Sequence, residues 1–211
     1  MEEAENPESS RQNNNLITIM SLNVITDSND SINDLQNAIT STLGNLYVRS
    51  IDNISIDYGN DKNRIGVTYM PGSSDTEYAG DFEIIADGNS SMTKLVNSLL
   101  ESISTEQDLT ANLVPTSIAV AYTNNKHRAT VAMGPSSIVG LPGNENYSIA
   151  SFKEKNVDTL ETDVNTWLAN NTGITVIDTH YYYGDSKNRF WVLYYGTETD
   201  DTNDQTPSTS D

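Results

Sequence analysis

The chain has 211 residues and carries 30 acidic against 11 basic side chains, which gives a formal net charge of -19. Hydrophobic residues make up 36% of it, below the roughly 45–50% of an average soluble domain, and no apolar run approaches the ~18 residues that a membrane helix needs. The absence of cysteine excludes a disulfide scaffold, a thiolate metal site and a cysteine nucleophile. Because phosphates repel an acidic surface, we expect no nucleic acid as a direct partner. Without an apolar segment of sufficient length, we expect no membrane partner.

Both ends of the chain are polar, acidic and without periodicity. We therefore expect residues 1–15 and 197–211 to be disordered tails that keep the protein soluble, with a partner-binding tail as the alternative. A signal peptide begins with basic residues and continues with an apolar stretch, whereas Glu2, Glu3 and Glu5 occupy this start. We accordingly expect a cytoplasmic protein.

The first ordered segment, residues 16–70, changes its periodicity along its length. A strand-like run at 16–26 is followed by apolar residues at helical steps of three and four. Two further strand-like runs, at 51–58 and 65–70, flank turn-prone residues and predict a hairpin. The helical stripe consists of Ile32, Leu35, Ile39, Leu43 and Leu46. The segment as a whole predicts a β-α-β-β unit.

The same order of elements returns over residues 78–134 and 146–196. The connections at 71–77 and 135–145 are rich in Pro, Gly and Ser, and we expect linkers there. The strand-like runs are 81–86, 117–122 and 129–133 in the second segment, and 147–153, 175–183 and 190–195 in the third. The helical stripes are Met92, Leu95, Leu99 and Ile103, and then Leu160, Val164, Trp167 and Leu168.

One motif, Y-x-x-x-K-[NH]-R-x-x-V, marks the hairpin of every segment and begins at Tyr58, Tyr122 and Tyr183. Its recurrence at nearly even spacing indicates that the chain is a threefold repeat. A single unit of this size is only marginally stable alone, and packing of the units would bury surface that one unit leaves exposed. We expect one compact α+β body with approximate threefold pseudo-symmetry. A head-to-tail array is the less favoured arrangement.

The third segment resembles a small sporulation-protein family of Bacillus species. The residues that carry the resemblance are 159–168, which read TLETDVNTWL, and the triplet Val176-Ile177-Asp178. The family pattern is similar: an acidic L-E-x-x-V-N-x-F-L helix is followed by V-I-D at the start of a strand. The resemblance implies one unit of this fold. It implies no site residues, because the family has no assigned activity.

The basic residues concentrate in the three hairpin motifs, and their role is open to three interpretations. Each cation could pair with a nearby acid such as Asp57, Asp61 or Asp185, or keep a sheet edge soluble. The three pairs could instead meet near the symmetry axis and bind a phosphate or carboxylate ligand through charge-assisted hydrogen bonds. Contact with an acidic partner is the third interpretation. The residues are Lys62, Arg64, Lys126, Arg128, Lys187 and Arg189.

The third segment differs from the others on one face of its predicted sheet. Alternate residues of a strand share a face, and here the face away from the helix is large and apolar instead of small or polar. Packing between neighbouring units would explain it. A patch for a partner protein is the alternative, since Trp and Tyr are enriched at interface centres. The residues of this face are His180, Tyr182, Trp191, Leu193 and Tyr195.

Enzyme motifs are missing from the sequence. The stretch from Asp27 begins like a calcium loop, but Ile32 and Ala38 stand where that loop needs Gly and an acid. No nucleophile elbow, phosphate loop or dinucleotide fingerprint occurs. We therefore expect no catalytic residue, no metal and no cofactor.

The leading hypothesis is a non-catalytic acidic protein that binds a protein with a basic surface. By analogy of class, such a protein could be a phage or mobile-element inhibitor, a decoy for a host protein that handles nucleic acid. The second hypothesis is sequestration of an anionic small ligand, a nucleotide or phosphate, by the Lys-x-Arg hairpins. The third is a structural component of a virion or spore assembly.

Overall fold

The computed structural model describes residues 22–72, 82–109, 112–143 and 145–198. The predicted tail at 1–15 and most of the tail at 197–211 lie outside the described residues. The elements in chain order are β1 (Asn23–Asn29), α1 (Ile32–Gly44), β2 (Val48–Gly59), β3 (Lys62–Pro71), β4 (Glu83–Asn89), α2 (Met92–Leu109), β5 (Leu113–Thr123), β6 (Lys126–Pro135), α3 (Ser136–Val139), β7 (Tyr147–Glu154), α4 (Val157–Asn170), β8 (Ile174–Gly184) and β9 (Lys187–Gly196).

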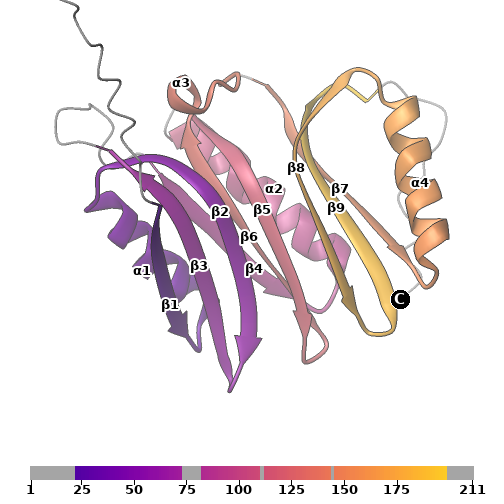
Figure 1. Ribbon diagram of the computed structural model, residues 1–211, viewed down its shortest axis with the longest axis horizontal. Helices are drawn as coiled ribbons and strands as arrows, with labels where there is room; N and C mark the ends of the chain where they lie inside the picture. Colours follow the sequence, from indigo (N-terminus) through magenta and orange to yellow (C-terminus); the bar gives the residue numbers. More distant parts are fainter. Residues whose placement is uncertain (1–21, 73–81, 110–111, 144, 199–211) are drawn as a thin grey trace, which may run out of the picture.

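The fold is α+β, as predicted, and each segment forms its own three-stranded sheet (Figure 1). The last strand of each segment lies in the middle, so the orders are β1-β3-β2, β4-β6-β5 and β7-β9-β8, with every pairing antiparallel. The predicted linker at 135–145 includes Pro135, the last residue of β6, and the short helix α3.

The three hairpins use the same turn. In each, two residues with left-handed backbone angles connect the strands: Asn60-Asp61, Asn124-Asn125 and Asp185-Ser186, all with φ between 52° and 60°. Two such residues in a two-residue loop form a type I′ turn, whose twist matches the twist of the flanking strands. Asn and Asp tolerate this conformation better than most residues. The turn places the Lys-x-Arg sequence at the start of β3, β6 and β9.

The middle strands also meet their partners in the same register. β2, β5 and β8 each contain an extra residue that has no partner on the central strand: Asp52, Thr116 and Ile177. In all three sheets this residue lies opposite the bond between the seventh and eighth residues of the central strand. Such a bulge bends the strand and increases its twist. The bulge therefore curves β2, β5 and β8 in the same place.

Each sheet has a helix face, which its own helix covers, and an outer face on the opposite side. Ile65, Val67 and Tyr69 lie buried on the helix face of the first sheet, as predicted from their alternation. The core beneath α1 also includes Ile84 and Ala132 from the outer face of the second sheet. The first segment thus packs its helix face on the outer face of the second, and the second packs in the same way on the third.

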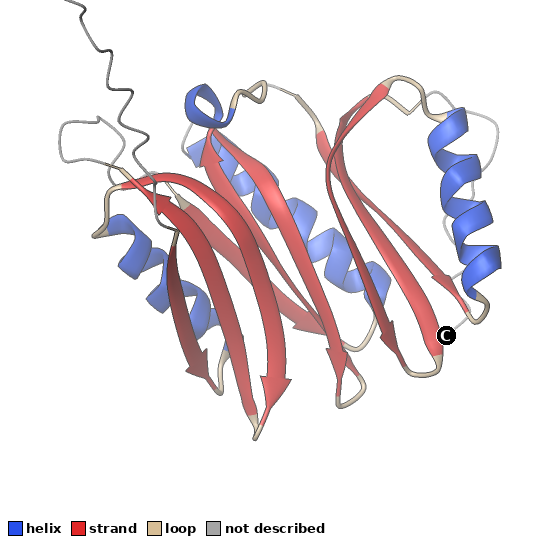
Figure 2. Ribbon diagram, in the orientation of Figure 1, coloured by secondary structure: helices blue, strands red, loops and turns tan. Residues whose placement is uncertain are grey.

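The segments form a row (Figures 1 and 2). β2 packs against β5 and β6, β5 packs against β8, and the helices α1 and α2 contact β4 and β7 of the following segment. The extensive contacts of the described residues all lie within a segment or between segments adjacent in sequence. This is the head-to-tail array, not the compact pseudo-threefold body that we favoured. The reason is that the second and third sheets are apolar on both faces, so each needs a layer on either side.

Side chains of α1 also protect the edge of the second sheet. The hydroxyl of Thr40 accepts a hydrogen bond from the amide of Ile84 at 3.1 Å, and Oε1 of Gln36 accepts one from the amide of Ala86 at 2.8 Å. These amides belong to β4, an edge strand that would otherwise offer them to another chain. None of the helices in the described ranges is both long and apolar enough to cross a membrane.

Candidate functional site

The helix face of the third sheet has no covering layer along β8. The corresponding strands β2 and β5 pack against the sheet of the next segment, whereas β8 has no following sheet in the described residues and α4 packs on β7 and β9. Val176, Tyr181 and Tyr183 are consequently 41%, 50% and 64% exposed. We call the surface formed by Val176, Thr179, Tyr181 and Tyr183 the open face.

Tyr181 shows how this surface differs from its counterparts. It lies opposite Phe190 of β9, and Ile56 and Val120 lie opposite the same position of β3 and β6. Ile56 is 8% exposed and Val120 is 3% exposed, against 50% for Tyr181. The open face is therefore a surface that both preceding segments bury against a neighbour.

A tyrosine and an arginine join the segments at each junction. The guanidinium carbon of Arg128 lies 3.9 Å from the centre of the Tyr58 ring, and that of Arg189 lies 4.9 Å from the centre of the Tyr122 ring. In both cases the ring comes from one segment and the arginine from the next. A buried contact of this kind stabilises by about 2 kcal/mol. Tyr183 is the third tyrosine of the series, and no arginine of the described residues lies over it.

The two junction arginines donate their hydrogen bonds to acceptors within the chain. Nε of Arg128 donates to Oδ1 of Asn63 at 2.7 Å, and its Nη1 donates to the carbonyl of Thr123 at 2.9 Å. Nη1 of Arg189 donates to the carbonyl of Gly184. Burial lowers the pKa of Arg128, while Tyr58 and Asp57 partly counteract that effect. Both arginines act as ties between segments.

The six predicted anion-binding cations do not gather around one ligand. Arg128 and Arg189 are 6% and 2% exposed, and each lies in a different junction. Their lysine neighbours Lys62 and Lys126 are exposed at the hairpins, Lys187 is half-buried, and Arg64 lies on the outer face of the first sheet. The contacts of the two buried arginines support a structural role, in which each joins two segments.

The residue between the lysine and the arginine has a role that the sequence analysis missed. Nδ2 of Asn63 donates to the carbonyl of Asp30 at 2.9 Å, and Nδ2 of Asn188 donates to the carbonyl of Lys155 at 2.9 Å. Both carbonyls lie in the connection from the first strand to the helix. The asparagine therefore ties that connection to the central strand, and its recurrence within the motif was the available signal.

His127 occupies the same position in the second segment and makes a different contact. Its Nδ1 lies 2.9 Å from the hydroxyl of Tyr182, across the junction to the third sheet. Burial lowers the pKa of His127 to about 4, with the charges of Arg189 and Lys153 acting in the same direction and Asp185 against them. Burial also raises the pKa of Tyr182. The pair is a neutral hydrogen bond inside a junction.

The predicted partner patch lies in the same junction and is mostly inaccessible. Trp191 and Leu193 are fully buried, Tyr182 is 9% exposed, and His180 and Tyr195 are half-buried. Their face packs on the core of the second segment. The contacts of these residues support the other interpretation, which is packing between neighbouring units. The exposed tyrosines of the third sheet stand on the opposite face.

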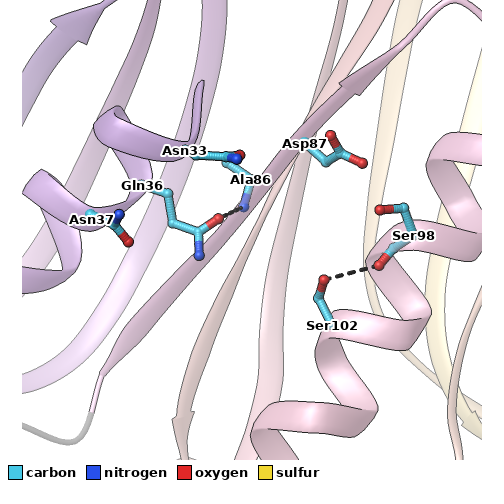
Figure 3. A pocket seen from close by; sticks show the side chains of 7 residues that line it. All are labelled: Asn33, Gln36, Asn37, Ala86, Asp87, Ser98 and Ser102. Atoms are coloured by element: carbon cyan, nitrogen blue, oxygen red, sulfur yellow. Dashed lines mark hydrogen bonds between the residues drawn. The ribbon is translucent and has the colours of Figure 1, made fainter. Parts of the chain in front are cut away.

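A shallow groove of about 450 Å³ lies between α1 and α2 (Figure 3). Three of its polar side chains form local hydrogen bonds: Gln36 accepts from the amide of Ala86, the hydroxyl of Ser102 donates to the carbonyl of Ser98 at 3.0 Å, and Asp87 accepts from the amide of Gly88 at 2.6 Å. Within the described residues, no three His, Asp or Glu side chains are placed to hold a metal ion. The open face is therefore the candidate site. The groove is lined by Asn33, Gln36, Asn37, Ala86, Asp87, Ser98 and Ser102.

Comparisons of the chain with family models, with curated proteins and with solved structures found no match. The resemblance of the third segment to a sporulation-protein family therefore stays a prediction.

Proposed function

We propose that the chain is a non-catalytic cytoplasmic protein that works by protein–protein contact, and that the open face is its binding surface. The observation that supports this is the exposure of Tyr181, 50%, at a position that is nearly buried in both preceding segments. Tyrosine suits such a surface because its ring buries a large area while its hydroxyl keeps a polar partner. An exposed apolar strand face with no such role would favour aggregation.

We also infer that the three segments are copies of one β-α-β-β unit. The inference is supported by their common strand order, turn, bulge position and Lys-x-Arg motif. If they are copies, the open face is the surface that a further copy would cover. Its partner then resembles the second segment: a sheet face of mostly short side chains with one arginine, Arg128.

The charge of the chain favours a partner with basic residues. Asp158, Glu161 and Asp163 are exposed on α4, the helix of the same segment, and the net charge is -19. An acidic rim accelerates encounter with a basic surface and weakens as salt is raised. A surface of this kind is suited to competing for the nucleic-acid site of another protein, the form of inhibition that the leading hypothesis describes.

The test compares capture by three forms of the tagged protein in a lysate of its source cells. Tyr181→Asp places a charge on the open face, and Tyr47→Asp makes the same change at a tyrosine that is 46% exposed elsewhere. We expect a partner that the wild type and Tyr47→Asp retain and that Tyr181→Asp loses. Equal capture by all three forms, with each variant folded by circular dichroism, would show that the open face is not the binding surface.

A further inference from the structure

In the row of described segments, one tyrosine and one arginine of the junction type have no partner, and they lie at opposite ends of the row. At each junction, an arginine on the outer face of one sheet lies over a tyrosine at the hairpin of the preceding sheet. Tyr183, 64% exposed, has the place of Tyr58 and Tyr122 at one end. At the other end, Arg64 has the place of the junction arginines, and no aromatic ring of the described residues lies beneath it.

The surroundings of Tyr183 match those of the first junction. Oδ1 of Asn63 accepts from Nε of Arg128 there. At the open end, Oδ1 of Asn188 accepts instead from the hydroxyl of Tyr181 at 2.7 Å. The acceptor for an incoming arginine is therefore in place, and a half-exposed tyrosine side chain now uses it.

The outer face of the first sheet has a shape similar to that of the outer face of the second sheet, which forms a junction. It consists of short side chains around one projecting arginine, and a recess of about 420 Å³ lies beside Arg64. Its three rows are Val24, Thr68 and Asn53; Thr26, Gly66 and Ser55; and Ser28, Arg64 and Asp57. The corresponding rows of the second sheet are Ile84, Ala132 and Ser117; Ala86, Thr130 and Ala119; and Gly88, Arg128 and Ala121.

The two outer faces differ in polarity. Thr26 and Ser55 stand where the second sheet has Ala86 and Ala119, so the first sheet can face water when it is uncovered. Burying hydroxyls contributes less to association than burying alanine methyl groups, because each hydroxyl must find a new hydrogen bond. An interface on this face would therefore be weaker than the internal junctions.

We propose that the open face also binds a second copy of this chain, joined head to tail, in competition with the basic partner of the proposed function. The open face of one copy packs on the outer face of the first sheet of the next, and Arg64 of that copy lies over Tyr183 and donates to Asn188. Because the two surfaces are different, this contact does not close into a symmetric dimer and extends the row of sheets from copy to copy. The inference goes beyond the proposed function, because it gives the same surface a second occupant.

Sedimentation of the purified chain over a wide concentration range tests the proposal. We expect species of increasing size as concentration rises, and stronger association at raised salt, since salt screens repulsion between copies that each carry a charge of -19. Arg64→Ala and Tyr183→Ser should each weaken association about tenfold or more. Lys94→Ala and Tyr47→Ser remove an equivalent exposed charge and an exposed ring elsewhere, and should leave it unchanged.

A mixture of the two junction variants makes the test specific. Arg64→Ala keeps an intact open face and Tyr183→Ser keeps an intact Arg64, so together they should form dimers that do not grow further. A wild-type chain that stays monomeric at every concentration and salt overturns the proposal, as does a dimer that survives Arg64→Ala. Neither result affects the capture test with Tyr181→Asp, so failure of the head-to-tail contact is distinguishable from failure of the open face.

Discussion

Arg128 lies with its guanidinium carbon 3.9 Å from the centre of the Tyr58 ring, and the two residues belong to different segments of the chain. The same arginine donates to Asn63, which holds the connection between β1 and α1. One buried side chain thus ties the hairpin, the strand-to-helix connection and the neighbouring sheet together. The junction depends on it more than on any exposed cation of the motif.

Replacing Arg128 by alanine should lower the free energy of unfolding by about 3 kcal/mol, because the ring contact is lost and the buried acceptor on Asn63 is left unpaired. Urea denaturation measures the change. Arg64→Ala is the matched control, since Arg64 has the same motif position on an uncovered face, and should change stability by less than about 0.5 kcal/mol. Equal losses in the two variants would contradict the assignment of Arg128 to a junction.

His127 should make the protein less stable as pH falls from about 6.5 to about 4. The folded protein lowers the pKa of His127 to about 4, from an ordinary value of 6.5, so the unfolded chain takes up a proton first. Stability rises with pH wherever the unfolded state binds more protons. The contribution is complete above pH 6.5 and declines through this range.

His127→Asn removes this titration and introduces the residue that Asn63 and Asn188 provide at the same motif position. Unfolding free energies measured between pH 4 and pH 7 should vary less with pH in the variant than in the wild type. An unchanged slope would show that His127 does not titrate in this way.

Glu83 should act in the opposite direction over an overlapping range. Burial raises the pKa of Glu83 to about 7, and a hydrogen bond and charge repulsion from Glu106 add to the effect. The folded protein therefore holds a proton that the unfolded chain releases above pH 4.5, and this contribution to stability is lost as pH rises to 7.

Glu83→Gln keeps the hydrogen-bonding shape without the charge. At pH 8 it should raise the free energy of unfolding by about 1 kcal/mol, a modest figure because the carboxyl is half-exposed. Glu101→Gln, at an exposed position of α2, should have no comparable effect. Thermal unfolding at pH 8 compares the two, and a destabilised Glu83→Gln protein would refute the explanation.

Gly184 is required by the second junction, whereas its counterpart Gly59 lies on the uncovered outer face of the first sheet. A Cβ on Gly184 would lie 2.8 Å from Cδ1 of the Tyr122 ring, whereas a Cβ on Gly59 would meet only the end of the Arg64 side chain. We expect Gly184→Ala to cost about 1–3 kcal/mol through overpacking and Gly59→Ala to be nearly neutral. Denaturant unfolding of both variants measures the change in the free energy of unfolding. Similar losses in the two variants would mean that the Tyr122 ring can move aside.

Most of the elements follow from local sequence. The apolar steps that include Leu35, Ile39 and Leu43 predict a helix over those residues, and these three side chains are buried on it. Turn residues such as Asn60 and Asp61 predict a hairpin, because few residues tolerate the left-handed conformation that its turn needs. Such preferences operate within a few residues of the chain, so they can be read before any packing is known.

Which of two neighbouring side chains on a strand is buried does not follow from local sequence. Alternation along the third hairpin places Tyr181 and Tyr182 on opposite faces, and the predicted partner surface used Tyr182. In the structure Tyr182 is 9% exposed and Tyr181 is 50% exposed. Which face is covered depends on the second segment, whose packing partners are about sixty residues away in the chain, as the contact between His127 and Tyr182 illustrates.

By itself, the amino-acid sequence determined three β-α-β-β segments, their hairpins and the two faces of each sheet, because periodicity and turn chemistry are local. Only the tertiary structure decided that the segments form a row, that Arg128 and Arg189 lie inside junctions, and that the face along β8 is left uncovered. The physical reason is that burial is a property of surfaces brought together from distant parts of the chain. The position of a side chain along a strand determines which face of the sheet it lies on. The neighbouring layer then determines whether that face contacts protein or water.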